Sequence, residues 1–202
     1  TVAPYIGTYY VCFNTEDEVF SNPLVRQAFS LVIDRNYIVE NVSQSGEVPA
    51  TGYVPSGVYD AEGANGDDFR TVGGEYYSVS ADDYQANCDK ARELLAEAGY
   101  ADGFDVDLTV CDLDMEGVAL TDLAQKVKDD LSQIGINVNI VSQPWAAGYG
   151  DDYRDGKLGF TVMYWGTDYN DPNVQLEFLP GASVGLRAGW TTEMDPELAA
   201  LY

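Results

Sequence analysis

Three strand-like segments between residues 104 and 165 are separated by helical patterns, and this order constrains the fold more than any other feature of the chain. Residues 104–110 and 136–140 alternate apolar and polar side chains, as expected of strands with one face in water. Residues 158–165 form an unbroken apolar run, typical of a strand covered on both faces. Strands and helices in alternation are the pattern of βαβ crossovers, so the sequence predicts an α/β fold with a largely parallel sheet.

Capping residues predict where several helices begin and end. Asn22 followed by proline favours a helix start, and Asp34 can cap a second helix. Ser80 opens a capping-box pattern before an apolar helical face, and Gly99 is placed to end that helix. A second amphipathic helix is expected to end at Gly135.

Other segments give weaker signals. Residues 8–14 are rich in β-forming side chains and predict a strand, while residues 145–156 suggest a short helix. Asp171 and Pro172 are expected to start a further helix. Between residues 44 and 80 the periodicity disappears among Gly, Pro, Tyr and Asp, which predicts a long irregular loop.

The net charge excludes some partners. The chain has 34 acidic and 10 basic residues, for a formal charge of −24. Nucleic acids and anionic membranes are poor partners for such a surface, because phosphate binding requires clustered Lys and Arg. The acidity is typical of a solvated or salt-adapted surface, and attraction of cationic ligands is the alternative.

Several kinds of chemistry are also excluded. The chain contains no histidine, so a Ser/His/Asp or Cys/His catalytic apparatus and histidine metal sites cannot form. Cys12, Cys88 and Cys111 have no metal-binding or redox spacing and are interpreted as small buried apolar residues. Neither of the common glycine-rich nucleotide-binding motifs occurs. We therefore expect no cofactor and no enzyme activity.

Clusters of aspartate are interpreted as surface charge. Asp112, Asp114 and Glu116 imitate the start of a calcium loop, but the twelfth position, which requires a bidentate Glu, is Leu123. A solvated turn is the expected structure there, and no metal site is predicted. The adjacent pairs lie on predicted helices, where neighbouring side chains diverge, and are expected at the surface: Asp82-Asp83, Asp129-Asp130 and Asp151-Asp152.

The sequence YWGTDYNDP, residues 164–172, is the candidate binding site. It follows the apolar run, and ligands of α/β sheets usually bind beyond the carboxyl ends of strands. Trp165 offers an apolar face and an N–H donor, and Gly166 allows close approach of another backbone. The carboxylate of Asp168 can bind one cation. The alternative is that Trp165 belongs to the core and Asp168 caps a turn.

The chain resembles the family of extracytoplasmic solute-binding proteins that serve ABC importers of oligopeptides and dipeptides. The resemblance rests on NPLVRQAFSLVIDRNYIV at 22–39, KARELLAEAGY at 90–100, LSQIGINVNI at 131–140 and WGTDYNDP at 165–172. It implies a type II periplasmic-binding-protein-like lobe with a mixed, mostly parallel sheet flanked by helices. Residues 1–202 would be the second large lobe of a two-lobed protein, consistent with a chain that lacks an initiator Met.

The resemblance also implies a function and a site. Tyr164 to Gly166 match the stretch whose backbone binds a peptide in a strand-like manner, and Asp168 matches the aspartate that pairs with the peptide amino group. Tyr169 completes the expected set of ligand-binding residues. The implied partners are a peptide or small solute, the membrane subunits of an ABC importer and the first lobe of the same protein. The implied location is extracytoplasmic, with a lipid anchor on the full-length protein.

Two departures leave alternatives open. Residues 158–164 have no Arg or His to receive a peptide carboxylate, and the same family includes binders of nickel complexes and sugars. A non-peptide solute therefore remains an alternative ligand. A carboxylate-based hydrolase and a structural or adhesive surface module are the alternatives from other functional classes.

Overall fold

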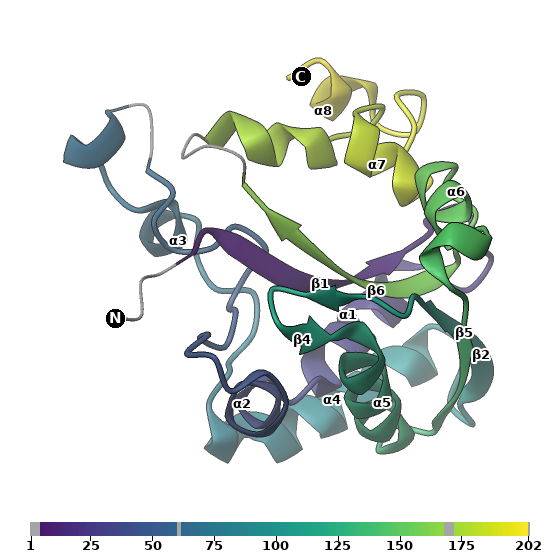
Figure 1. Ribbon diagram of the computed structural model, residues 1–202. Helices are drawn as coiled ribbons and strands as arrows, with labels where there is room; N and C mark the ends of the chain where they lie inside the picture. Colours follow the sequence, from purple (N-terminus) through teal and green to yellow (C-terminus); the bar gives the residue numbers. More distant parts are fainter. Residues whose placement is uncertain (1–4, 60–61, 168–171, 202) are drawn as a thin grey trace.

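A computed structural model describes residues 5–59, 62–167 and 172–201 (Figure 1). Its main sheet has four strands in the order β1-β6-β2-β5. β6 is antiparallel to β1 and parallel to β2, which is parallel to β5. The sheet is thus mixed and mostly parallel, as predicted. Its strands are β1 (Gly7–Phe13), β2 (Phe104–Val110), β5 (Ile136–Ser142) and β6 (Phe160–Gly166).

One face of the sheet is covered by the longest helices, α1 (Pro23–Val32), α4 (Tyr84–Glu97) and α5 (Leu120–Ser132). Figure 1 shows these helices on the same side of β1 and β6. Five phenylalanine rings meet between this layer and the sheet, with neighbouring ring centroids 4.9 to 6.0 Å apart where α1 contacts β1, β2 and β6. We call this side the helix-packed face.

The opposite face is covered by shorter elements. Figure 1 shows the segment from η5 to α8 lying across the sheet from α1 and α5. Residues 160–163 of β6 are buried, which confirms the prediction of a strand covered on both faces over its first half. The elements on this side are α6 (Tyr149–Arg154), η5 (Pro172–Phe178), α7 (Ser183–Arg187) and α8 (Pro196–Ala199).

The predicted caps are confirmed. The side chain of Asn22 accepts from the backbone N–H of Leu24, and that of Asp34 accepts from the N–H of Tyr37. Ser80 caps a 3-10 turn that continues into α4. Asp34 precedes α2 (Arg35–Tyr37) and the π-helix η1 (Ile38–Ser43), and Ser80 precedes η3 (Ala81–Asp83).

Two helix predictions differ in form from the structure. Gly148 has φ +115° and interrupts the segment predicted as one short helix at 145–156, so η4 (Trp145–Ala147) and α6 are separate. A φ of this sign is inaccessible to a continuing α-helix. The helix expected to start at Asp171-Pro172 is a 3-10 helix, η5, and Asp171 itself lies outside the described residues.

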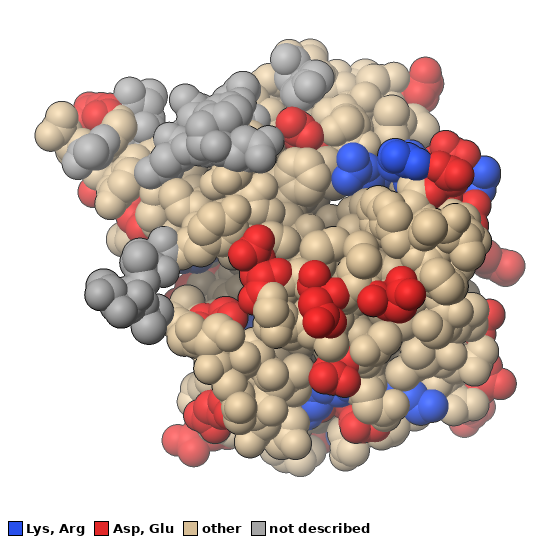
Figure 2. Space-filling model, in the orientation of Figure 1, with Lys and Arg blue, Asp and Glu red and all other residues tan. Residues whose placement is uncertain are grey.

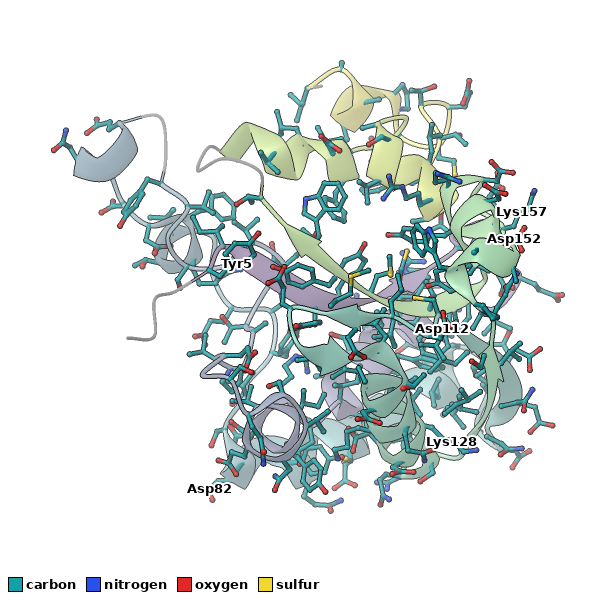
Figure 3. All side chains as sticks on the ribbon, viewed as in Figure 1. Tyr5, Asp82, Asp112, Lys128, Asp152 and Lys157 are labelled. Carbon is teal, nitrogen blue, oxygen red and sulfur yellow. The ribbon has the colours of Figure 1, made fainter. Side chains whose placement is uncertain are left out.

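The described residues between 44 and 80 contain little regular structure. They include η2 (Gly63–Asn65), α3 (Phe69–Val72) and an isolated bridge between Tyr59 and Asp68. The segment is anchored to the sheet because the Thr8 hydroxyl donates to the carbonyl of Tyr53 over 2.9 Å. Figure 1 shows α3 beside the start of β1, and Figure 3 shows Tyr5 in the same region.

The predictions for cysteine and aspartate are confirmed with one exception. All three cysteines are free and buried. Asp82, drawn at the periphery in Figure 3, is exposed, as are Asp129 and Asp151. Asp130 contradicts the prediction of surface charge, because only 3% of its surface is accessible. Its carboxylate is 2.5 Å from the Lys126 ammonium and accepts from the Asp34 backbone N–H, which compensates its burial.

Candidate functional site

The candidate site begins where β6 ends. On one side β6 pairs with β1 along its full length, from Phe13↔Phe160 to Gly7↔Gly166. On its other side β2 pairs at Thr109↔Thr161, near the start of the strand. In the described residues the second half of β6 therefore has a partner strand on one side only.

The register shows which backbone groups face that open side. The backbone N–H of Thr167 donates to the carbonyl of Ile6, and that of Asn14 donates to the carbonyl of Gly159, both over 2.9 Å. Hydrogen-bonded and non-hydrogen-bonded pairs alternate along antiparallel strands. The main chain of Trp165 therefore faces β1, and those of Tyr164 and Gly166 face away from it.

We call the outward-facing backbone of Tyr164 and Gly166 the free edge of β6. Each residue has one N–H donor and one carbonyl acceptor, so the free edge can bind an extended chain in the manner of an added strand. The resemblance predicts one role for the backbone of all three residues, 164–166. The structure brings Tyr164 and Gly166 to this edge, while the backbone of Trp165 is directed to Thr8.

Glycine at the end of this strand pair leaves room for the side chain of Tyr164. A Cβ atom added to Gly7 would lie 2.2 Å from the Tyr164 hydroxyl oxygen, and one added to Gly166 would lie 2.8 Å from it. The ring of Tyr164 also packs on Tyr9, 4.8 Å away, and on Tyr5, 6.4 Å away. Burial raises the pKa of Tyr164, so its hydroxyl stays protonated.

Trp165 lies on the opposite face of the sheet from Tyr164. Its ring meets Phe178 of η5 edge to face, with centroids 5.6 Å apart, and the guanidinium carbon of Arg187 lies 5.7 Å from the ring centroid. The indole N–H is buried and has no hydrogen-bond partner in the part of the chain that the structure describes. Trp165 is half-buried, so it contributes to packing and also retains an unused donor.

Asp168 and Tyr169, the remaining predicted site residues, lie outside the described residues. Their roles stay predictions. The part of the chain before them ends at Thr167, whose side-chain hydroxyl donates to the carbonyl of Ile6 over 3.1 Å.

Sequence reasoning missed the two side chains that contact Trp165, Phe178 and Arg187, and the tyrosines that pack on those two in turn. Phe178 and Arg187 follow Trp165 in the chain, whereas Tyr53 and Tyr153 precede it, and none belongs to a recognisable motif. The hydroxyl of Tyr153 is 2.7 Å from that of Tyr10, and Tyr53 packs 4.3 Å from Phe178. We call the side chains of this group the Tyr–Trp layer, which consists of Tyr10, Tyr53, Tyr153, Trp165, Phe178 and Arg187. Only the scarcity of basic residues could have drawn attention to Arg187.

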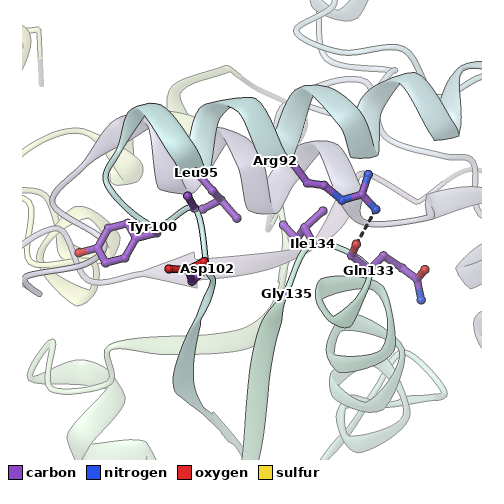
Figure 4. A pocket seen from close by; sticks show the side chains of 8 residues that line it. Arg92, Leu95, Tyr100, Asp102, Gln133, Ile134 and Gly135 are labelled. Carbon is purple, nitrogen blue, oxygen red and sulfur yellow. Dashed lines mark hydrogen bonds between the residues drawn. The ribbon is translucent and has the colours of Figure 1, made fainter.

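A separate pocket lies at the opposite end of the parallel strands. It has a volume of about 240 Å³ and is formed by the loops that precede β2 and β5. Figure 4 shows Arg92 at its rim, with the guanidinium donating to the backbone carbonyl of Gln133. β6 is parallel to β2, so this pocket is remote from the end of β6.

The calcium-like segment forms a hairpin. Strands β3 (Asp114–Met115) and β4 (Val118–Ala119) are joined by Glu116 and Gly117, which have φ of +49° and +83°. Such a turn confirms the solvated-turn interpretation. Within residues 5–59, 62–167 and 172–201, no group of three or more acidic or cysteine side chains is arranged to hold a metal ion. Nor does any described helix have the length and apolar character needed to cross a bilayer.

Comparison with known proteins identifies the family. Residues 1–184 match the model of bacterial extracellular solute-binding proteins, family 5 middle region. The chain belongs to this family. It is a family of binding proteins, which agrees with the expectation that the chain is not an enzyme.

Named relatives include binders of different ligands. The chain is 31% identical over 176 residues to the periplasmic oligopeptide-binding protein OppA of Salmonella typhimurium, covering 85% of this chain and 29% of that protein. It is 30% identical over 183 residues to heme-binding protein A of Haemophilus influenzae, covering 88% and 30%. The chain therefore spans about 30% of the length of these relatives.

Solved structures show the same fold. The OppA structure from Burkholderia pseudomallei superimposes with a TM-score of 0.78 at 21% identity, covering 98% of this chain and 36% of that one. The murein tripeptide-binding protein MppA of Escherichia coli superimposes with a TM-score of 0.75 at 25% identity, covering the same shares. The predicted fold class is thereby confirmed.

Proposed function

We propose that the full-length protein captures extracellular peptides, or similar amine-bearing solutes, in a cleft between this lobe and the rest of the protein. It then delivers them to the membrane subunits of an ABC importer. The observation that supports the proposal most strongly is the free edge of β6, at the carboxyl end of a strand in an α/β sheet.

The free edge favours peptides because its chemistry is complementary to a peptide backbone. Tyr164 and Gly166 together offer two donors and two acceptors at the spacing of an extended chain. Main-chain hydrogen bonds of this kind supply affinity without reading side chains. A broad range of peptide sequences is therefore the expected ligand set.

Asp168 is proposed to bind the ligand's α-amino group, with Tyr169 beside it. The support is the match of WGTDYNDP to the family motif and the position of Asp168 two residues after Gly166. An unpaired, desolvated carboxylate is costly, so an acetylated amino group would bind less tightly by about 2 to 5 kcal/mol. This role accounts for the aspartate three positions after Trp165 in the sequence.

A non-peptide solute is the second candidate. The family relatives include a protein named for heme binding, and the ring of Trp165 is a half-buried aromatic surface. Aromatic side chains can stack on flat or ring-shaped solutes. Nickel complexes and sugars are further members of this class of ligand.

The test is calorimetric titration of the full-length protein with di-, tri-, tetra- and penta-alanine, each with a free or an acetylated N-terminus. We expect binding of at least one free peptide and a loss of about 30-fold or more on acetylation. Asp168→Asn should remove that difference, whereas Asp129→Asn, an exposed position on α5, should retain it. Equal affinity for the free and acetylated peptides would contradict the role of Asp168.

A second measurement tests the cleft between lobes. The 202-residue chain alone leaves the free edge of β6 open to water, where an exposed ion pair contributes only about 0 to 1 kcal/mol. We expect millimolar binding, at best, for this chain in NMR titrations with the same peptides, and much tighter binding for the full-length protein. Micromolar binding by the 202-residue chain would show that the site is complete without the other lobe.

An extracytoplasmic location with a lipid anchor completes the proposal. The curated relatives include proteins named as periplasmic. Fractionation of cells that produce the full-length protein, with and without detergent, would distinguish a membrane-anchored form from a freely soluble one.

A further inference from the structure

We propose that Glu116, at the tip of the hairpin formed by β3 and β4, makes the candidate site selective for peptides with a Lys or Arg side chain. This inference rests on the proposed function. A hydrogen bond fixes the hairpin against the sheet. The hydroxyl of Tyr9, on β1, donates to the backbone carbonyl of Met115 over 2.6 Å, and Glu116 is the next residue.

The hairpin lies against the second half of β6, on the helix-packed side. Side chains alternate between the two faces of a strand, so Tyr164 is on the same side as Phe160. Tyr9 is opposite Tyr164 in the register, and their ring centroids are 4.8 Å apart. The chain enters the hairpin from β2 and contacts β1 through Tyr9, while β6 lies between these two strands in the sheet. The hairpin therefore crosses the strand that has the free edge (Figure 1).

This position places Glu116 where side chains of a bound peptide would lie. An extended peptide at the free edge of β6 would direct alternate side chains to the two faces of the sheet. One set faces the Tyr–Trp layer, and the other faces the helix-packed side and the hairpin tip. Glu116 is exposed, so its carboxylate is accessible to a side chain of the second set.

No basic side chain of the chain neutralises Glu116. All ten Lys and Arg residues lie in the part of the chain that the structure describes, and none is within ion-pair distance of Glu116 there. Burial, Glu47 and Glu116 together raise the pKa of Tyr9 to about 12, so the charge of Glu116 acts on this end of the sheet. Figure 2 shows a line of Asp and Glu atoms over the hairpin.

Aromatic rings near Glu116 are a second feature that suits a cation. The ring of Tyr5 is 62% exposed and stacks on that of Tyr164, with centroids 6.4 Å apart. Burial raises the pKa of Tyr164, and Tyr5 and Glu116 contribute to the shift, so the carboxylate is close to this pair of rings. The face of an aromatic ring attracts ammonium and guanidinium groups. A carboxylate beside an exposed ring is therefore complementary to Lys or Arg and repels an acidic side chain.

The experiment uses tetra-alanine peptides in which one residue is replaced by Lys or by norleucine, which has a similar chain without the ammonium group. Calorimetry on the full-length protein measures their affinities for each of the four positions. Wild-type protein should bind the Lys peptide about fivefold or more tightly at the alternate positions that face the hairpin, and nearly equally elsewhere. Raising the NaCl concentration should reduce this preference, because salt screens the attraction.

The variants separate Glu116 from the overall charge of −24. Glu116→Gln should remove the preference by weakening the Lys peptides alone. Glu116→Asn is a second neutral variant that preserves the hairpin, because Glu116 and Gly117 both have positive φ and Asn-Gly is preferred in such turns. Glu97→Gln is the matched control, because it removes the same charge from an exposed position at the end of α4. Thermal melts establish that each variant is folded.

The outcomes separate this inference from the proposed function. If wild-type protein binds Lys and norleucine peptides equally at every position, or if the Glu116 variants retain the preference, Glu116 does not select the ligand while peptide binding stands. If Glu97→Gln lowers the preference as much as Glu116→Gln does, the overall charge is responsible and the proposal is overturned. If Glu116→Gln is unfolded, Glu116→Asn decides. If wild-type protein binds no peptide, both the proposed function and this inference fail.

Discussion

The two faces of the sheet are packed by different kinds of side chain. On the helix-packed face, Phe13 and Phe160 stack across paired strands and contact Phe20 and Phe29. On the other face, the Tyr–Trp layer contains hydroxyls, an indole N–H and a guanidinium, and two of its buried polar atoms have no partner. The first face is packed almost entirely by apolar rings, although the Tyr164 hydroxyl at its edge also has no hydrogen-bond partner among the described residues, whereas the second face combines several polar groups.

This difference indicates where stability and binding reside. Apolar burial contributes most of the free energy of folding, so the helix-packed face is expected to determine the stability of the chain. Unsatisfied polar groups lower stability but can be satisfied by a ligand. The binding site is therefore expected beside the face that is less well satisfied, at the end of the strand that both faces share.

The largest expected effect comes from breaking the helix-packed face. Phe160→Ala removes a ring that is 1% exposed and contacts three other phenylalanines. We expect the free energy of unfolding to fall by about 3 to 5 kcal/mol, from lost burial and the cavity that remains. Urea denaturation of the 202-residue chain measures it. The control is Trp165→Phe on the other face, for which a loss as large as that of Phe160→Ala would contradict the comparison.

The one buried ion pair of the described residues gives the next largest effect. Asp130→Ala leaves the Lys126 ammonium, whose side chain is 15% exposed, without its carboxylate. We expect a loss of about 3 kcal/mol in the free energy of unfolding at neutral pH. Asp129→Ala, at the exposed neighbouring position, is the matched control and should cost far less.

The same residue predicts a pH dependence. Burial raises the pKa of Asp130 above its ordinary value of 3.8, although Lys126 opposes the shift. The folded chain therefore binds the proton more readily than the unfolded chain, and protonation stabilises the fold. This contribution grows as the pH falls through the folded pKa, is complete below 3.8, and is lost as the pH rises. The difference in unfolding free energy between wild type and Asp130→Ala should accordingly widen at acidic pH; a constant difference would contradict the shift.

Thiol labelling compares the two faces without substitution. Cys12 points toward the Tyr–Trp layer, beside Thr161, whereas Cys88 is buried on α4, in the helix-packed face. Burial raises the pKa of Cys12 to about 12, so labelling requires opening of the structure around it. Because shorter elements cover the side of Cys12, it should react about tenfold or more faster than Cys88 under native conditions. Mass spectrometry of the labelled peptides measures both rates, and equal rates would show that the two faces open together.

Local signals in the sequence predicted the helix-packed face well. The caps at Asn22, Asp34 and Ser80 each depend on a hydrogen bond to a residue at most three positions away, so the local sequence is enough to predict them. The parallel strands were predicted because their alternation reflects one wet face. Asp130 was misjudged because its burial depends on Asp34, which lies far away in the sequence.

The candidate site could be predicted only in part. The apolar run and YWGTDYNDP located the end of β6, because a buried strand and the loop after it are continuous in sequence. The direction of the backbone groups depends on the register with β1, which no local pattern encodes. The Tyr–Trp layer joins residues from β1, the 44–80 segment, α6, η5 and α7, so its existence follows from the fold alone.

The smallest expected effect tests whether buried polar groups on the second face truly lack hydrogen-bond partners. Tyr53→Phe deletes a buried hydroxyl that has no hydrogen-bond partner among the described residues, so the fold loses a desolvation cost and keeps the ring packed on Phe178. We expect the free energy of unfolding to rise by about 1 kcal/mol. Tyr10→Phe is the matched control, because the Tyr10 hydroxyl is bonded to Tyr153 over 2.7 Å and its removal should cost about 1 kcal/mol.

The same pair of variants connects stability to binding. If the Tyr53 hydroxyl is a donor reserved for the ligand, Tyr53→Phe should stabilise the 202-residue chain and yet weaken peptide binding by the full-length protein. Tyr10→Phe should instead lower stability and leave affinity nearly unchanged, since its hydroxyl is already used within the chain. A Tyr53→Phe variant that is less stable than wild type would mean that this hydroxyl already has a partner, and that the two faces are equally well satisfied.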